Sequence, residues 1–453
     1  MSAIVASLSS FATSVVDRAI AAGATAAEVY VRQGREAEIA VRNGGIEKLT
    51  EGAPKSVGIR LWVDDRSAST FATDFSDASI ARLIAETLTL TKLVDPVPEA
   101  ALIDAAYLAS ATPDLDLFDA GVAAVQAADK LARVRACEAA ALGHDARVTT
   151  SGGASYSDLV MAHVLANSHG FARGYEESFV SYDVQVIADD DGGKKRNGMW
   201  YTFGRHLDQL RDAEHVGRTA AERAVRQLGA GPVPTAKLPV VFDPRAASAL
   251  IGAMFGCMKG GAIERRASYL VDRVGTQVAS PLVTLVDDPT MPRAPGSRPF
   301  DGEGMAARRT TFVDAGTLTG YALNSFSARK LGLQPTGHAS RPASGSTGET
   351  SSNLFLAAGA SDPEAIVRDV AFGFYCESMM GFGFNPVTGD FSRGASGRLI
   401  ENGVLTRPVS EVTLSCNFLD LFGRIDAVGT DLEHDRSTCS PTIRVSEMTL
   451  AGS

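Results

Sequence analysis

The sequence contains few of the residues that bind metals or form disulfides. Its 453 residues include seven histidines and five cysteines. No two histidines have the i, i+3 or i, i+4 spacing that places a pair of zinc ligands on one face of a helix. The cysteines are odd in number, widely separated and without a C-x-x-C pair, so they support neither a disulfide framework nor a structural zinc site. We therefore expect a reducing, cytoplasmic location.

Three further absences limit the possible partners. Lys and Arg number 43 against 53 Asp and Glu, a net charge of −10, so the chain lacks the basic excess that nucleic-acid binding requires. No apolar run approaches about 18 residues, and the first residues lack the basic segment of a secretory signal, so we expect no membrane contact. The G-x-S-x-G motif of serine hydrolases and the G-x-x-x-x-G-K-[ST] phosphate loop are also missing.

Secondary-structure patterns divide the chain into regions. Up to residue 230, strands with alternating polarity (28–32, 38–42) mix with helical segments, including one continuous Ala-rich helix over 120–142. The Gly- and Pro-rich segment 229–234 is the clearest linker, and strand patterns predominate after it. We therefore predict an α+β protein. Its N-terminal mixed α/β region, with an antiparallel sheet and flanking helices, comprises subdomains 1–95 and 96–230, and a C-terminal β-rich domain spans 235–453.

The most informative feature is an apolar helical segment, 249–261, at the start of the C-terminal region. It is followed by the strings SARKLG (327–332), PTGHA (335–339), GDFSRGASG (389–397) and VGTDLE (428–433). In this order and spacing they resemble the TldD/PmbA family, on its PmbA (TldE) branch. In the TldD branch the helix carries a zinc-binding His-Glu-x-x-x-His motif. On that frame the corresponding positions are Gly252, Ala253 and Cys257, and Cys439 stands where the family has a metal-binding cysteine.

The resemblance covers both halves of the chain and implies a C-terminal, mostly antiparallel, barrel-like domain. It further implies a cytoplasmic metallopeptidase acting on unfolded or flexible peptides, in which this chain is a non-catalytic subunit. Zinc is then expected only in a TldD-like partner, and no cofactor on this chain. The expected assembly is a heterodimer with that partner or a homodimer. Two alternatives stay open: a regulatory protein-binding module, since the family has been described as a modulator of DNA gyrase, and a self-sufficient homodimeric peptidase.

Other residues in these strings are candidates for a substrate or partner cleft. They are His338, Asp390 and Arg393, of which the last two form either a structural ion pair or the rim of a cleft. Pairing of Cys257 with His338 is the arrangement that a cysteine protease would need. Cys257 and Cys439 are either inert buried thiols or, if they approach each other, two thiolates that hold a soft metal.

Two loops complete the expectations. The acidic segment 300–304, followed by Arg308 and Arg309, is expected to form a tight turn with ion pairing. The glycine-rich segment 337–348 is poor in apolar residues, and we expect the segment 340–352 to be mobile.

Overall fold

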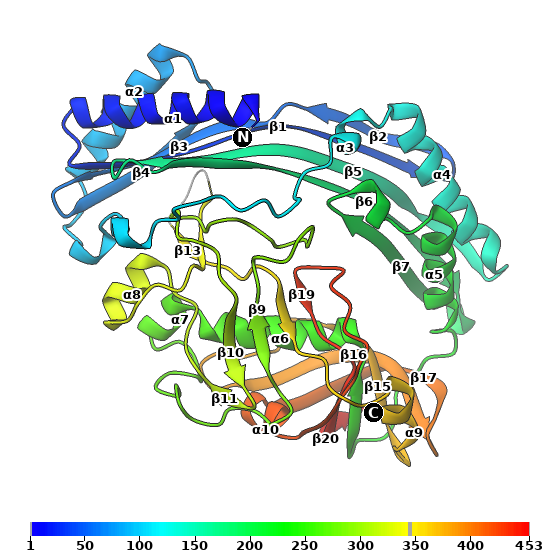
Figure 1. The fold of residues 1–453 in the computed structure, drawn as a ribbon. Helices are drawn as coiled ribbons and strands as arrows, with labels where there is room; N and C mark the ends of the chain where they lie inside the picture. Colours follow the sequence, from blue (N-terminus) through cyan, green and yellow to red (C-terminus); the bar gives the residue numbers. More distant parts are fainter. Residues whose placement is uncertain (1, 343–346, 453) are drawn as a thin grey trace.

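In the computed structural model, which describes residues 2–342 and 347–452, the chain forms two stacked parts (Figure 1). The N-terminal part is a broad curved sheet with helices on its outer side. The C-terminal part lies beneath the inner side of that sheet. This arrangement confirms the predicted α+β class.

The N-terminal part is built on one antiparallel sheet of seven strands. Their order is β4-β3-β1-β5-β6-β7, with β2 paired to β1. The two strands expected at 28–32 and 38–42 are one long strand, and Asn43 and Gly44 turn the chain after it with φ values of 50° and 74°. The strands are β1 (Ala26–Arg42), β2 (Gly45–Gly52), β3 (Lys55–Val63), β4 (Arg66–Ala72), β5 (Val148–Asn167), β6 (Ala172–Asp189) and β7 (Lys195–Gly204).

Helices cover the outer side of this sheet (Figure 1). α1 (Ala3–Ala21) and α2 (Asp77–Thr91) lie at one end, and α4 (Ala127–His144) and α5 (Ala213–Val225) lie at the other. Among the described residues α1 alone has the length and hydropathy of a membrane span, but its apolar face packs on β1 and β5. Short 3₁₀ helices connect the elements: η1 (Pro98–Ala100), η2 (Ala105–Tyr107), η3 (Asp191–Gly193) and η4 (Leu207–Gln209).

The prediction of a single Ala-rich helix over 120–142 was wrong. α3 (Ala120–Ala124) ends at Val125, whose φ of −62° and ψ of 122° are extended, and α4 begins two residues later. The break lets α4 pack separately against α5 and β5.

The C-terminal part contains a closed barrel, which confirms the barrel-like prediction. Its strands are ordered β17-β16-β15-β8-β20, and pairing of β17 with β20 closes the ring, with β18 added beside β20. The β8–β15 pair is parallel and the other pairs are antiparallel. The strands are β8 (Ala236–Phe242), β15 (Phe372–Met380), β16 (Asp390–Glu401), β17 (Val404–Asn417), β18 (Ile425–Val428) and β20 (Ile443–Ala451).

The predicted apolar helix is α6 (Pro244–Met258), which packs between the barrel and a second, smaller sheet. That sheet has the order β11-β10-β9-β14-β19. The remaining elements are α7 (Gly260–Glu264), β9 (Leu285–Asp287), β10 (Thr310–Asp314), β11 (Thr317–Leu318), α8 (Ser325–Leu331), β12 (Ala339–Ser340), β13 (Gly348–Glu349), β14 (Leu354–Leu356), α9 (Pro363–Arg368), α10 (Phe418–Gly423) and β19 (Thr438–Cys439).

Two sequence-based expectations concern the boundaries of these parts. β1–β4 and β5–β7 belong to one sheet, and the division between residues 95 and 96 stays a prediction. Of the segment 340–352, residues 343–346 lie outside the described residues. Beyond them the chain is packed: Ser352 is buried, and its N–H donates to Asp287 Oδ1 at 2.8 Å.

Candidate functional site

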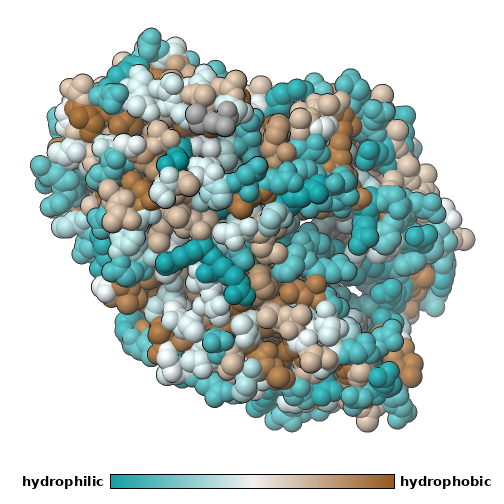
Figure 2. Space-filling view, viewed as in Figure 1, coloured by the Kyte–Doolittle hydropathy of each residue, from teal (hydrophilic) through white to brown (hydrophobic). Residues whose placement is uncertain are grey.

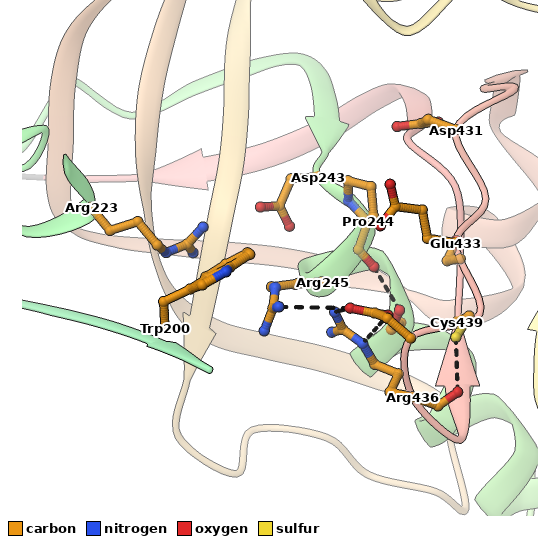
Figure 3. A pocket seen from close by; sticks show the side chains of 12 residues that line it. Trp200, Arg223, Asp243, Pro244, Arg245, Asp431, Glu433, Arg436 and Cys439 are labelled. Carbon is orange, nitrogen blue, oxygen red and sulfur yellow. Dashed lines mark hydrogen bonds and ion pairs between the residues drawn. The ribbon is translucent and has the colours of Figure 1, made fainter. Parts of the chain in front are cut away.

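A cleft separates the edge of the N-terminal sheet from the C-terminal part, and Figure 2 shows the surface hollowed between the two parts. Residues 200–204 of β7, the last strand of its sheet, line a cavity of about 720 Å³. A second pocket of about 230 Å³ adjoins it and shares several lining residues with it (Figure 3). We name this second space the arginine pocket, and it is lined by Trp200, Arg223, Asp243, Pro244, Arg245, Ser248, Asp431, Glu433, Asp435, Arg436, Cys439 and Ser440.

The sequence explains why α6 begins at this cleft. Asp243 follows β8 and accepts a hydrogen bond of 2.7 Å from the Ala246 N–H, as an N-cap residue does. Pro244 occupies the first helical position, where its missing N–H has no helical partner to lose. Arg245 then projects from the first turn into the arginine pocket (Figure 3).

The facing wall is the loop that precedes β19. Asp431 fixes this loop by accepting hydrogen bonds from the N–H and hydroxyl of Thr442, at 3.0 and 2.7 Å. Asp435 receives two hydrogen bonds from the guanidinium of Arg436, at 3.0 and 2.9 Å. The Cys439 thiol donates to the Arg436 carbonyl oxygen at 3.1 Å. These contacts place an ion pair and a thiol opposite α6.

Three guanidinium groups converge on the arginine pocket. The Arg245 Cζ lies 3.7 Å from the ring centroid of Trp200, and the Arg223 Cζ lies 5.0 Å from the same ring. Arg245 is also 3.8 Å from Asp435. Burial lowers the pKa of Arg245, and the charge of nearby Arg436 lowers it further. Stacking on an indole ring stabilises a guanidinium while leaving its N–H donors at the ring edge available to a ligand.

The residues at the family's metal positions do not fit zinc. Gly252 has no side chain and Ala253 carries only a methyl group, and both lie partly exposed on α6. A Cβ on Gly252 would meet one neighbour, Thr438 Cγ2 at 3.9 Å, so space for a ligand exists but the ligand atoms do not. Within the ranges 2–342 and 347–452, no group of three or more His, Cys, Asp or Glu residues could hold a metal ion. A zinc site needs about three such ligands.

The two candidate cysteines are both buried. Burial raises the pKa of Cys257 to about 12 and that of Cys439 to about 11, so both thiols stay protonated near neutral pH. Cys439 lines the arginine pocket together with Ser248, whereas Cys257 lies nine residues further along α6, about 13 Å along the helix axis. Cys257 packs in the core, where its carbonyl accepts a hydrogen bond from Ser268 at 2.6 Å.

The three predicted cleft residues do not line the cleft described above. His338 is buried, with Nδ1 2.9 Å from the Thr336 hydroxyl, and its Nε2 lies 3.2 Å from Asp287 Oδ2 but has no hydrogen-bond partner among the described residues. Asp390 and Arg393 lie an odd number of residues apart on β16, and they therefore point to opposite faces of the strand.

The proposed Asp390–Arg393 ion pair is not what forms. Asp390 instead accepts hydrogen bonds from the hydroxyl of Thr388 and the amide of Asn417, at 2.7 and 3.1 Å, and both contacts lower its pKa. In the part of the chain that the structure describes, Arg393 Nε is buried without a hydrogen-bond partner. The role of these two residues at a cleft rim stays a prediction.

The acidic segment 300–304 forms the expected turn without the expected ion pairs. Asp301 is buried and accepts hydrogen bonds from backbone N–H groups, including that of Met305 at 2.9 Å. Burial, reinforced by the charge of Glu303, raises its pKa to about 6. Arg308 donates to a backbone carbonyl, and Arg309 lies 3.7 Å from Asp288. Backbone amides therefore replace arginines as the partners of Asp301.

Sequence reasoning missed most of the cleft. Trp200, Arg223, Arg245 and Arg436 come from four separate segments, and no local motif joins them. Two weak signals were present: the adjacent aromatic residues at 200–201 in a chain with two tryptophans, and the polar run at 433–436, which begins with the last residue of the string VGTDLE.

Comparison with known proteins gives the family. Residues 27–132, 121–228 and 235–452 match domain 1, the central domain and the C-terminal domain of the PmbA/TldA metallopeptidase models. The chain is 34% identical to metalloprotease PmbA of Escherichia coli O157:H7 over 94% of this chain and 92% of that protein. It is 31% identical to a PmbA homologue of Haemophilus influenzae over 96% of this chain and 94% of the relative.

Solved structures agree with these matches. A candidate modulator of DNA gyrase from Bacteroides thetaiotaomicron superposes with a TM-score of 0.92 at 27% identity, covering 98% of both chains. TldE from Thermococcus kodakarensis has the same fold, with a TM-score of 0.84 at 19% identity over 98% of this chain and all of that one. The chain therefore belongs to the PmbA/TldD metallopeptidase family.

Proposed function

We propose that this chain is the non-catalytic, PmbA/TldE-type subunit of a cytoplasmic metallopeptidase that acts on unfolded or flexible peptides. Its role is to hold an extended peptide in the cleft beside β7 and to bind a TldD-like subunit, which supplies the zinc. The observation that carries this proposal is the open edge of β7 along the cleft.

The edge of β7 suits a peptide that lacks structure. β7 pairs with β6 on one side, and residues 200–204 line the cavity of about 720 Å³. Among the described residues, no backbone hydrogen bond outside the β6–β7 pairing involves 200–203. Main-chain groups at an open edge can pair with an extended chain almost regardless of its side chains. Such pairing selects for the extended conformation, which a folded substrate cannot offer.

We assign hydrolysis to another subunit because this chain lacks metal-binding side chains at the positions where the family binds zinc. α6 is in place and Gly252 has open space beside it, but Gly252 and Ala253 offer no metal-binding atom. Cys257 and Cys439 do not line a common pocket, since only Cys439 borders the cleft. A chain that keeps the helix and the cleft without the ligands is suited to binding substrate beside a catalytic partner.

The direct test is a reconstitution. The chain is purified without chelator and incubated with casein, alone and with a TldD-like chain from the same organism. We expect no cleavage by the chain alone, cleavage by the mixture, and loss of that cleavage when the partner's zinc is removed. Elemental analysis of the lone chain should give zinc far below one atom per chain. Chelator-sensitive cleavage by the lone chain would overturn the proposal in favour of a self-sufficient homodimer.

A capture experiment separates the regulatory alternative. The tagged chain is offered purified DNA gyrase and the TldD-like chain in equal amounts. Retention of the TldD-like chain supports the proposal, whereas retention of gyrase alone supports a regulatory binding module.

A further inference from the structure

The arginine pocket has hydrogen-bond donors to spare. Most of the carboxylate acceptors are already used: Asp431 holds Thr442 and Asp435 is paired with Arg436. Asp243 caps α6 through Oδ1; burial raises its pKa and the charge of Arg223 opposes that rise, while Glu433 is exposed. Arg436 is bound to Asp435, but the N–H donors of the other two arginines in the pocket, Arg223 and Arg245, have few acceptors among the described residues.

Arg223 and Arg245 are the arginines with free donors. In the described part of the chain the Arg223 guanidinium has a contact with the Trp200 ring but no hydrogen bond or ion pair. The Arg245 side chain is only 21% exposed, and within the described ranges it contacts one carboxylate, that of Asp435, at 3.8 Å. A largely buried cation with few partners gains most from an anionic ligand that accepts its hydrogen bonds.

We propose that Arg223 and Arg245, stacked on Trp200, bind a carboxylate of the peptide that lies along β7. A guanidinium matches a carboxylate in shape and charge and can donate two parallel hydrogen bonds to it. This inference rests on the proposed function, because it requires a peptide in the cleft. It adds a substrate class to that function: peptides with a carboxylate at the Trp200 end of the cleft.

The direction of β7 selects the source of the carboxylate. β7 runs from the arginine pocket at Trp200 toward Gly204 and the larger cavity. A peptide added in the antiparallel sense, the more frequent pairing, runs the opposite way, toward Trp200. Its C-terminal end therefore reaches the arginine pocket. Arg245 and Arg436 line the pocket at that end (Figure 3), so the α-carboxylate of the bound peptide is the group that the pocket receives.

The test compares peptides that differ in this group. A short unstructured peptide without acidic residues, labelled at its N-terminus, is prepared as a free acid and as a C-terminal amide. A third peptide carries an amide end and a glutamate as its last residue. Binding to the full chain is measured by fluorescence anisotropy. We expect the free acid to bind at least about tenfold more tightly than the amide, the effect of losing charge-assisted hydrogen bonds.

Variants place the effect in the pocket. Arg223→Met and Arg245→Met keep most of the side-chain stem and remove the guanidinium, so each should reduce the preference for the free acid. Arg218→Met is the matched control, because Arg218 lies on the same helix as Arg223, is 46% exposed and pairs with Glu214 outside the pocket. Thermal melts of all three variants check that they fold.

Each binding result supports or overturns the carboxylate site, and the results separate it from the proposed function. Equal affinity for the free acid and the amide overturns the inference but leaves the proposed function standing, as does a preference that survives both pocket substitutions. Tight binding of the glutamate amide supports a carboxylate site and assigns it to an acidic side chain. Failure of all three peptides to bind overturns the proposed function and this inference together.

Discussion

The Nη1 of Arg205 lies 3.0 Å from Oε2 of Glu177, and the same guanidinium donates to carbonyl oxygens in the segment 294–297 of the C-terminal part. Arg205 directly follows β7, and Pro295 lines the larger cavity of the cleft. One buried arginine thus links the end of β7, the edge strand of the N-terminal sheet, to the C-terminal part across the cleft. The width of the cleft therefore depends on this contact.

Replacing Arg205 should destabilise the whole chain. Arg205→Met removes the donor to the carbonyl oxygens of the segment 294–297 and one of the two partners that Glu177 has among the described residues, the other being His163. Losing one partner of a buried pair costs about 3–5 kcal/mol. We expect a loss of that size in the free energy of unfolding, measured by urea denaturation. Arg18→Met removes an exposed pair with Asp77 and should change little. A loss at Arg205 no larger than at Arg18 would contradict the role assigned to it.

Glu177, with its partners His163 and Arg205, predicts an acid-sensitive contribution to the stability. Burial alone would raise the pKa of Glu177, but the hydrogen bond and charge of His163, with the Arg205 guanidinium, lower it to about 2. Because the folded pKa lies below the unfolded one, this stabilisation is complete above about pH 4.5 and is lost as the pH falls toward 2. It amounts to about 3 kcal/mol.

Urea denaturation between pH 6 and pH 3 measures this contribution. Glu177→Gln should lower stability at pH 6 and flatten the decline toward low pH. Glu176→Gln, one residue earlier and on the other face of β6, should keep the decline of the unsubstituted chain. An unchanged slope in Glu177→Gln would show that another carboxylate accounts for the acid sensitivity.

Replacing either of two glycines in α6 by alanine should stabilise the protein. Glycine in a helix costs up to about 1 kcal/mol relative to alanine. A Cβ on Gly252 would meet no atom nearer than 3.9 Å, and one on Gly256 would meet none within 4 Å. We therefore expect Gly252→Ala and Gly256→Ala each to raise the unfolding free energy by about 0.5–1 kcal/mol.

A glycine of α5 provides the contrast. A Cβ on Gly217 would lie 2.4 Å from the Cys137 carbonyl oxygen, so Gly217→Ala should destabilise the protein. Destabilisation by the substitutions at Gly252 and Gly256 would contradict the open space that the structure shows beside these two positions.

The fold could be anticipated where its signals are local. Alternating polarity predicted the strand segments 28–32 and 38–42, which form β1, and the apolar pattern of 249–261 predicted the helix that forms α6. The closure of the barrel could not be read in this way. It depends on β17 pairing with β20, with Thr413 opposite Ala451. The local sequence around either residue does not identify the residue with which it pairs.

The cleft shows the same limit more sharply. The absence of ligands at Gly252 and Ala253 could be read from one helix, because a motif occupies consecutive positions. The arginine pocket needs Trp200 from β7, Arg223 from α5 and Arg245 from α6, which become neighbours only after the sheet folds over the C-terminal part. An arginine in a sequence is most often a solvated surface residue, so none of these positions was distinctive by itself.

The thiols give a last prediction, which bears on whether this chain could ever hold a soft metal. Thiolates, not thiols, bind metals and react with disulfides. Four of the five free cysteines are buried, and Cys416 is the partly exposed one. In a titration of the native chain with a disulfide reagent at pH 8, we therefore expect at most one fast-reacting thiol, with all five reacting in denaturant.

Two variants identify the fast-reacting thiol: Cys416→Ser should remove the fast phase and Cys439→Ser should preserve it. A fast phase that disappears in Cys439→Ser would reveal an accessible thiolate at the cleft. Cys439 could then bind a soft metal, which would contradict the inference that this chain holds none.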